Sequence, residues 1–111
     1  MTQEEIKQKA EDLSVKHGGK VHPIIFLIPE SDEKIIGFMQ EPPRFVKLRV
    51  MDKGLTTPVT AASEIVDAYL IKEESDPRIW SEDQSNDKYY LGACWEAYNI
   101  VTMAINQFKK K

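Results

Sequence analysis

The 111-residue sequence has one cysteine, two histidines and five glycines. With Cys94 as its single cysteine, the chain cannot form an internal disulfide, and we expect a reducing compartment. The histidines, His17 and His22, lie five residues apart across a Gly-Gly pair, and no third ligand stands at the spacing of a zinc site. Cys94 falls among bulky apolar residues, where burial suppresses thiol reactivity. The sequence therefore predicts no catalytic residue, no metal and no cofactor.

The chain also lacks an excess of positive charge and a long apolar run. Its formal net charge is −3 and its pI is about 5.4, which argues against nucleic-acid binding, because that affinity comes mainly from phosphate neutralisation. A membrane-spanning helix needs about 20 continuous apolar residues. Glu96, Asn99 and Asn106 interrupt the best candidate, and the polar stretch 2–5 has no apolar signal-peptide core. We expect neither a nucleic acid nor a membrane as partner.

The first part of the chain predicts a helix followed by a β-hairpin. Thr2 and Glu5 have capping-box spacing, and a helix over residues 3–17 would end at Gly18-Gly19. The runs 21–28 and 34–40 then read as two antiparallel strands, with a polar turn over 29–33. Pro23 lacks a backbone donor, so either it lies at a sheet edge or the strand begins after it. A two-stranded hairpin is marginal alone, so its apolar face should lie on a helix or on another subunit.

Three further helices are expected, over about 43–53, 58–71 and 87–109. Pro42-Pro43 suits the start of the first, whose apolar positions include Phe45 and Leu48. Thr57 is expected to cap the second, with Val59 on its apolar face, and Ser85 or Asn86 to cap the third. A charged linker over 72–86 separates the last two. The prediction is a single α+β domain over residues 1–111, mainly helical.

The last helix is apolar over most of its circumference. Its polar positions fall near one narrow line, formed by Glu96, Asn99, Thr102, Asn106 and Gln107 and extended by Gly92. A surface helix usually has one apolar stripe, so this helix should be the central packing element, with the polar line in solvent. Any apolar surface that the short helices leave uncovered is where we expect a second copy of the chain or another partner.

Five residues are candidates for partner binding: Arg44, Phe45, Trp80, Trp95 and Tyr98. Arg44 is a cation in the first turn of a helix, where it opposes the helix dipole, so an acidic partner would explain it. Trp80 stands in a polar loop, either as a binding residue or, as we favour, as a lid over the core of the domain. Trp95 and Tyr98 belong to the apolar last helix.

Four segments follow one another in an order that is known from a protein family. They are Glu41-Pro42-Pro43-Arg44 before a helix, Ala61-Ala62-Ser63-Glu64-Ile65-Val66, the turn Ser75-Asp76-Pro77-Arg78, and Asp87-Lys88-Tyr89-Tyr90-Leu91-Gly92-Ala93-Cys94 opening an apolar helix. This order resembles that of small tail assembly chaperones of long-tailed bacteriophages and prophages. The stretch 47–53 is also similar to phage proteins of gut bacteria.

The resemblance implies a protein without enzymatic activity that acts in the bacterial host cytoplasm. Such chaperones bind the tape-measure protein and help to assemble tail-tube subunits around it, and they leave before the virion is complete. One alternative is a small structural protein of the virion, for head or tail completion. A second alternative is a small enzyme or ligand-binding domain built on the side of the hairpin.

Overall fold

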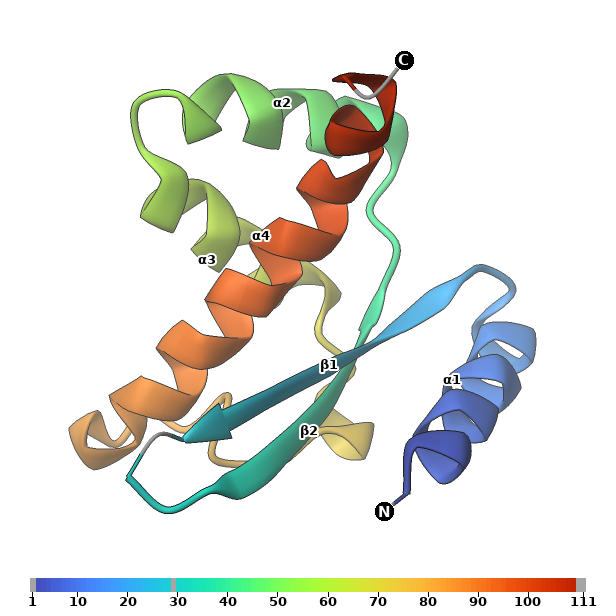
Figure 1. The fold of residues 1–111 in the computed structure, drawn as a ribbon, viewed down its shortest axis with the longest axis vertical. Helices are drawn as coiled ribbons and strands as arrows, with labels where there is room; N and C mark the ends of the chain where they lie inside the picture. The colour runs from blue at the N-terminus through green and yellow to red at the C-terminus, as the bar shows by residue number, and fades with distance from the viewer. Residues whose placement is uncertain (1, 29, 110–111) are drawn as a thin grey trace.

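The computed structural model describes residues 2–28 and 30–109, with side-chain surroundings as far as Met103 (Figure 1). The fold is α+β and mainly helical, as predicted. Its elements are α1 (Gln3–His17), β1 (Val21–Ile28), β2 (Glu33–Gln40), α2 (Arg44–Gly54), α3 (Pro58–Tyr69), the single-turn 3-10 helices η1 (Lys72–Glu74) and η2 (Gln84–Asn86), and α4 (Asp87–Lys109).

Helix α1 begins and ends where the sequence places it. The Thr2 hydroxyl accepts a hydrogen bond from the Glu5 N–H at 3.2 Å, and the Glu5 carboxylate accepts one from the Thr2 N–H at 3.1 Å. This reciprocal pair satisfies two donors that the first turn of the helix leaves free. Gly18 follows with a φ of 71°, the left-handed conformation that glycine adopts without strain.

The hairpin is covered by helices on both faces. Its strands pair antiparallel, from Val21 opposite Gln40 to Ile28 opposite Glu33. Alternate residues therefore point to opposite faces. One face packs on α1 in a cluster of Ile6, Ala10, Leu13, Val21, Phe38 and Ile71. The other face joins the larger core with α3 and α4, which contains Ile24, Ile28, Ile35 and Met39. The expectation that the hairpin lies on a helix is thus met twice.

The outer edge of β2 is covered by the segment 70–76. The Ile71 N–H donates to the Phe38 carbonyl at 2.8 Å, and the Asp76 N–H donates to the Ile36 carbonyl at 3.0 Å. The Ser75 hydroxyl, buried between them, accepts from the Phe38 N–H at 3.0 Å and donates to the Ile71 carbonyl at 2.7 Å. The segment between α3 and α4 contains no α-helix or strand, as expected of a linker, but its first part also pairs with the sheet through its backbone, which the sequence did not predict.

Among the residues that the structure describes, the outer edge of β1 donates a hydrogen bond to a side chain at its beginning. The Ser14 hydroxyl accepts from the Val21 N–H at 2.9 Å. Pro23 lies inside β1 opposite Phe38, whose own backbone groups bond to the segment 70–76. Pro23 therefore points its nitrogen away from β2, toward the sheet edge, where a missing donor costs no ladder bond.

Four expectations for α2 and α3 are corrected. Helix α2 buries Val50, with 1% exposure, whereas Phe45 and Leu48 are 69% and 56% exposed, so its apolar face is rotated from the predicted one.

Helix α3 ends at Tyr69, not at 71, because Leu70 turns extended and bridges to Met39. Val59 on α3 is 67% exposed. Thr57 holds the N-cap position, but its hydroxyl donates to the Lys53 carbonyl and caps no helix N–H.

The solvent-facing side of α4 also differs from the prediction. Its buried positions are mostly small, namely Ala93, Cys94, Ala97 and Val101. Gly92 faces the hairpin: a Cβ there would lie 2.5 Å from the Phe26 ring. Solvent is reached by Leu91, Trp95 and Met103, at 53%, 67% and 53% exposure, together with Asn99. Glu96 and Thr102 are only half-exposed, and the side chains of Asn106 and Gln107 lie outside the described region.

Helix α4 packs the side that carries its small residues against the hairpin, because small residues permit the closest approach between the two elements. Just before α4, Asp83 caps the short helix η2, because its carboxylate accepts from the Ser85 N–H at 3.0 Å; the predicted caps of α4, Ser85 and Asn86, belong to η2 itself. The consequence for function is that the solvent-facing side of α4 carries Leu91, Trp95 and Met103 beside Asn99, where only polar residues were expected.

Candidate functional site

An apolar groove runs between the first turns of α3 and the middle of α4. We call it the α3/α4 groove, and its cavity of about 220 Å³ is lined by Pro58, Val59, Ala62, Leu91, Cys94, Trp95 and Tyr98. Val59, Leu91 and Trp95 each expose more than half of their surface. A contiguous exposed apolar surface on a small protein marks an interaction site. The groove is therefore the candidate site.

Cys94 forms part of the floor of this groove. It is 3% exposed, and burial raises the pKa of its thiol to about 11. The thiol stays protonated at neutral pH, and a protonated thiol is a poor nucleophile. Nearby, the Tyr90 hydroxyl donates to Asp67 at 2.9 Å, and burial raises the Tyr90 pKa as well. Cys94 therefore contributes an apolar surface to the groove.

Tyr98 closes one end of the groove at the junction of α2 and α3. Its phenol lies where a Cβ on Gly54 would stand, so a side chain at position 54 would displace it. Gly54 is the last residue of α2, and Leu55 follows it with 86% of its surface exposed. The absence of a side chain at residue 54 thus sets where the Tyr98 ring can lie.

A second cavity, which we call the acidic pocket, lies farther along the same two helices. It measures about 320 Å³ and is lined by Val66, Asp67, Leu70, Lys72, Trp80, Ser81, Glu82, Asp87 and Tyr90. Three carboxylates face one ammonium group, so its formal charge is −2. Trp80 is 42% exposed, and its indole N–H donates to the Lys72 carbonyl at 3.1 Å.

Trp80 does not form the expected lid over the core, and its neighbour Ile79 is the residue that packs there. Ile79 has no exposed surface and belongs to the main core, whereas Trp80 forms a wall of the acidic pocket. Both residues precede α4, but of the two only Ile79 anchors the 70–86 segment in the core. The indole is left in contact with solvent, at the edge of a cavity rather than over the core.

The five predicted binding residues fall into three places. Trp95 and Tyr98 meet in the α3/α4 groove, Trp80 lines the acidic pocket, and Arg44 and Phe45 are exposed on α2. In the part of the chain that the structure describes, Arg44 forms no ion pair. Sequence reasoning missed Val59 and Leu91, because exposed and buried apolar residues share the same helical spacing. Pro58 next to Val59 was a usable signal, since the first turn of a helix is rarely fully covered.

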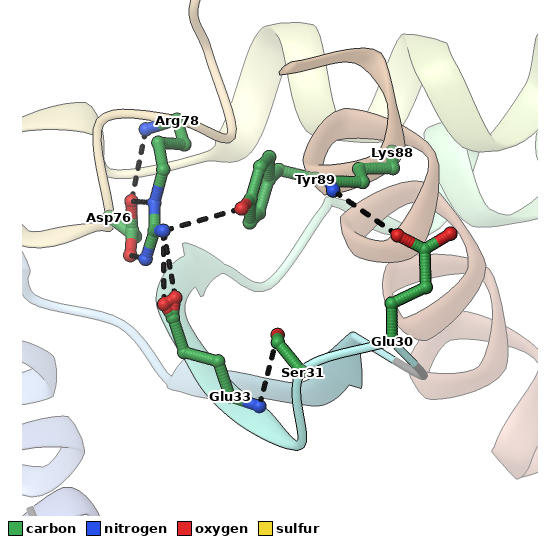
Figure 2. A network of polar contacts seen from close by, with 7 residues as sticks. All are labelled: Glu30, Ser31, Glu33, Asp76, Arg78, Lys88 and Tyr89. Atoms are coloured by element: carbon green, nitrogen blue, oxygen red, sulfur yellow. Dashed lines mark hydrogen bonds and ion pairs between the residues drawn. The ribbon is translucent and has the colours of Figure 1, made fainter. Parts of the chain in front are cut away.

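Arg78 holds the hairpin turn, the 76–78 loop and α4 together (Figure 2). Its guanidinium donates to Asp76 at 2.8 Å and to Glu33 at 2.8 Å, and it lies 4.6 Å from the centre of the Tyr89 ring. The hydrogen bonds from Arg78 lower the pKa of Asp76. A Lys88–Glu30 pair at 3.9 Å lies beside it. Every charge in this network has a partner within the chain, so its role is structural.

The histidines form side-chain contacts at the far end of the hairpin. His22 lies 3.2 Å from Glu41, and His17 lies 3.4 Å from Gln40. Among the described residues, no three His, Cys, Asp or Glu side chains come together as a metal site would require. Within the same residues, no helix combines the length and the apolar character needed to cross a membrane.

No protein-family model, curated protein or solved structure matches this chain. A function therefore has to be argued from the α3/α4 groove and its surroundings.

Proposed function

We propose that the chain is a phage tail assembly chaperone without enzymatic activity, which binds an apolar helical segment of the tape-measure or tail-tube protein in the bacterial cytoplasm. The observation that carries the proposal is the α3/α4 groove, where Val59, Leu91 and Trp95 are exposed around one apolar cavity. The tail assignment rests on the order of sequence motifs described above.

The groove has the chemistry of a helix-binding site. An amphipathic helix binds such grooves through apolar residues at positions i, i+3 or i+4 and i+7. Trp95 is the residue type that most often dominates binding energy, and Pro58 and Tyr98 supply walls beside it. A chaperone that shields apolar helices needs a surface of this kind and no catalytic group.

The size of the groove favours reversible binding. Burying three apolar side chains contributes roughly 5–9 kcal/mol before costs. Association then loses several kcal/mol of translational and rotational freedom. The remainder corresponds to a dissociation constant in the micromolar range or weaker, since 1 µM equals about −8 kcal/mol. Weak binding suits a protein that releases its partner before the virion is complete.

The test is co-purification with the tape-measure and tail-tube proteins of the phage or prophage that would encode this chain. We expect Trp95→Glu to weaken binding at least tenfold, because it places a charge in the groove. Val15→Glu is the matched control: Val15 is 84% exposed on α1, away from the groove. Circular dichroism should show both variants folded. Unchanged binding by Trp95→Glu would exclude the groove as the site.

Mass spectrometry of purified particles separates the chaperone from a structural protein of the virion. A chaperone should be absent from finished particles while present in the lysate. Its recovery from particles in stoichiometric amounts would support the alternative of a head- or tail-completion protein.

A further inference from the structure

Helix α2 presents to solvent an apolar surface flanked by cations. Phe45 and Leu48 are 69% and 56% exposed on this helix. Arg44 is exposed beside them, and the Arg49 side chain remains 62% exposed although it lies 3.6 Å from Glu64. Residues four apart on a helix are neighbours on its surface. Each apolar residue therefore has an arginine one turn away, in the pairs Phe45–Arg49 and Leu48–Arg44.

The surface between α3 and α4 has the complementary pattern. Leu91 lines the α3/α4 groove, and Asp87, one turn earlier on α4, lines the acidic pocket. The apolar and the acidic parts are therefore about one helical turn apart, roughly 6 Å along α4. The same spacing separates the apolar and the basic residues of α2.

We infer that the α2 face of one copy of this chain docks into the α3/α4 groove of a second copy. Phe45 and Leu48 would cover the exposed Trp95, while Arg44 or Arg49 would approach the carboxylates of the acidic pocket. The formal charge of −2 at that pocket favours a basic helix and disfavours an acidic one, because like charges at an interface oppose docking. The chain itself supplies such a helix.

The α2 face and the acidic pocket lie toward opposite ends of the molecule, and the α3/α4 groove lies between them, with Tyr98 against Gly54 at the end of α2. Phe45 and Leu48 stay exposed and do not line the groove of their own copy. Figure 1 shows α2 at one end of the long axis and the first turn of α4, which carries Asp87, near the other. Two different surfaces in contact make a heterologous interface, which propagates from copy to copy into a ring or an open chain. The inference stands apart from the proposed function, because it requires no client. It adds one consequence: a client segment and a neighbouring α2 would compete for one groove.

Two single variants and their mixture test this arrangement. Phe45→Glu disrupts the apolar face of α2 and leaves the α3/α4 groove intact, whereas Trp95→Glu disrupts the groove and leaves the α2 face intact. Sedimentation velocity over roughly 5–200 µM should show that the mass of the unmodified chain rises beyond a dimer, and that each variant alone is monomeric. An equimolar mixture should form a 1:1 heterodimer that grows no further, because only one intact pair of surfaces remains.

The charge complementarity between the two surfaces can be tested independently of their apolar contacts. Asp87→Lys should weaken self-association on the order of tenfold, and raising the salt concentration from 50 to 300 mM should weaken it in the unmodified chain. Val15→Glu should associate as the unmodified chain does.

Three results would overturn the inference: an unmodified chain that stays monomeric at 200 µM, a mixture that forms no heterodimer, or a variant that dimerises alone. The client experiment remains separate, since Phe45→Glu should lose self-association and keep client binding. Trp95→Glu should lose both.

Discussion

Helices α1 and α4 cover opposite faces of one hairpin, but they differ on their outer sides. Helix α1 buries a single stripe, Ile6, Ala10 and Leu13, and most of its remaining surface is polar. Helix α4 buries small residues and leaves Leu91, Trp95 and Met103 in solvent. The apolar stripe of α1 is thus buried against the hairpin. Helix α4 has a second apolar side, which its own chain does not cover.

Apolar residues on the two helices therefore have different roles. On the α1 side, nearly every large apolar group contributes to the free energy of folding. On the outer side of α4, the largest groups contribute little to folding and remain free to contribute to binding. Substitutions on the two sides should therefore differ in their effect on the free energy of unfolding.

The largest effect is expected from Phe38→Ala. Phe38 has no exposed surface and lies in the cluster between α1 and the hairpin. Removing a buried aromatic ring leaves a cavity, so the free energy of unfolding should fall by about 3–5 kcal/mol. Urea denaturation followed by circular dichroism measures this. A loss below about 1 kcal/mol would mean that the α1 cover is not tightly packed.

A smaller effect is expected from Ser75→Ala, which leaves the buried Phe38 N–H without its side-chain partner. An unsatisfied buried donor costs about 1–3 kcal/mol of unfolding free energy. Ser85→Ala is the matched control, because Ser85 is exposed and its substitution keeps the backbone N–H that donates to Asp83. Equal effects of the two substitutions would show that Ser75 does not hold the 70–76 segment to β2.

Arg78→Met should cost about 0.5–1 kcal/mol at pH 7, because its partners are partly exposed and solvent screens the pairs. The Arg78 hydrogen bonds lower the pKa of Asp76, so their contribution is present above the ordinary Asp pKa and is lost as the pH falls through the lowered one. The difference between the two proteins should therefore shrink below about pH 4.

Thermal unfolding at pH 3, 5 and 7 measures this change. The control is Lys88→Met, which removes the exposed Lys88–Glu30 pair and the Lys88 contact with the Tyr89 ring but leaves Asp76 and Arg78 paired, and it should have little effect at any of these pH values. A stability difference for Arg78→Met that does not depend on pH would contradict the assigned role of Asp76.

The smallest effect on folding is expected from Trp95→Ala. Trp95 is 67% exposed, so the free energy of unfolding should change by no more than about 0.5 kcal/mol, despite the size of the indole. Urea denaturation beside Phe38→Ala compares the two aromatic residues directly. If Trp95→Ala destabilised the chain as much as Phe38→Ala, the contrast between the covered and the uncovered side would be lost.

The sequence predicts the local features of this fold well. The capping box at Thr2 and Glu5, the glycine at residue 18 and the polar hairpin turn each act over a few residues, so spacing alone identifies them. Residues 70–76 show the limit of this approach. Their backbone pairs with β2, more than thirty residues earlier in the chain, and so completes the sheet. Their charged side chains give no sign of this pairing.

The candidate site was only partly predictable. Trp95 and Tyr98 could be chosen as large apolar residues, but the side of α4 that faces solvent depends on Gly92, Ala93 and Ala97. Their small size brings the helix close to its neighbours, and that preference outweighs the polarity of Glu96. Hydrophobicity alone treats Val59 like the buried Ala62 of the same helix, so the groove between α3 and α4 emerged only from the packing.

The edges of the hairpin determine how copies of this chain can meet. Segment 70–76 already occupies one edge, while Ser14 and the missing donor of Pro23 interrupt the other. Unpaired strand edges are the usual starting points of uncontrolled aggregation. A chain that keeps exposed apolar groups on its helices, covers one strand edge and interrupts the other can remain adhesive toward helical partners while resisting growth into β-fibrils. Sheet extension would have to begin at the part of β1 that follows Pro23.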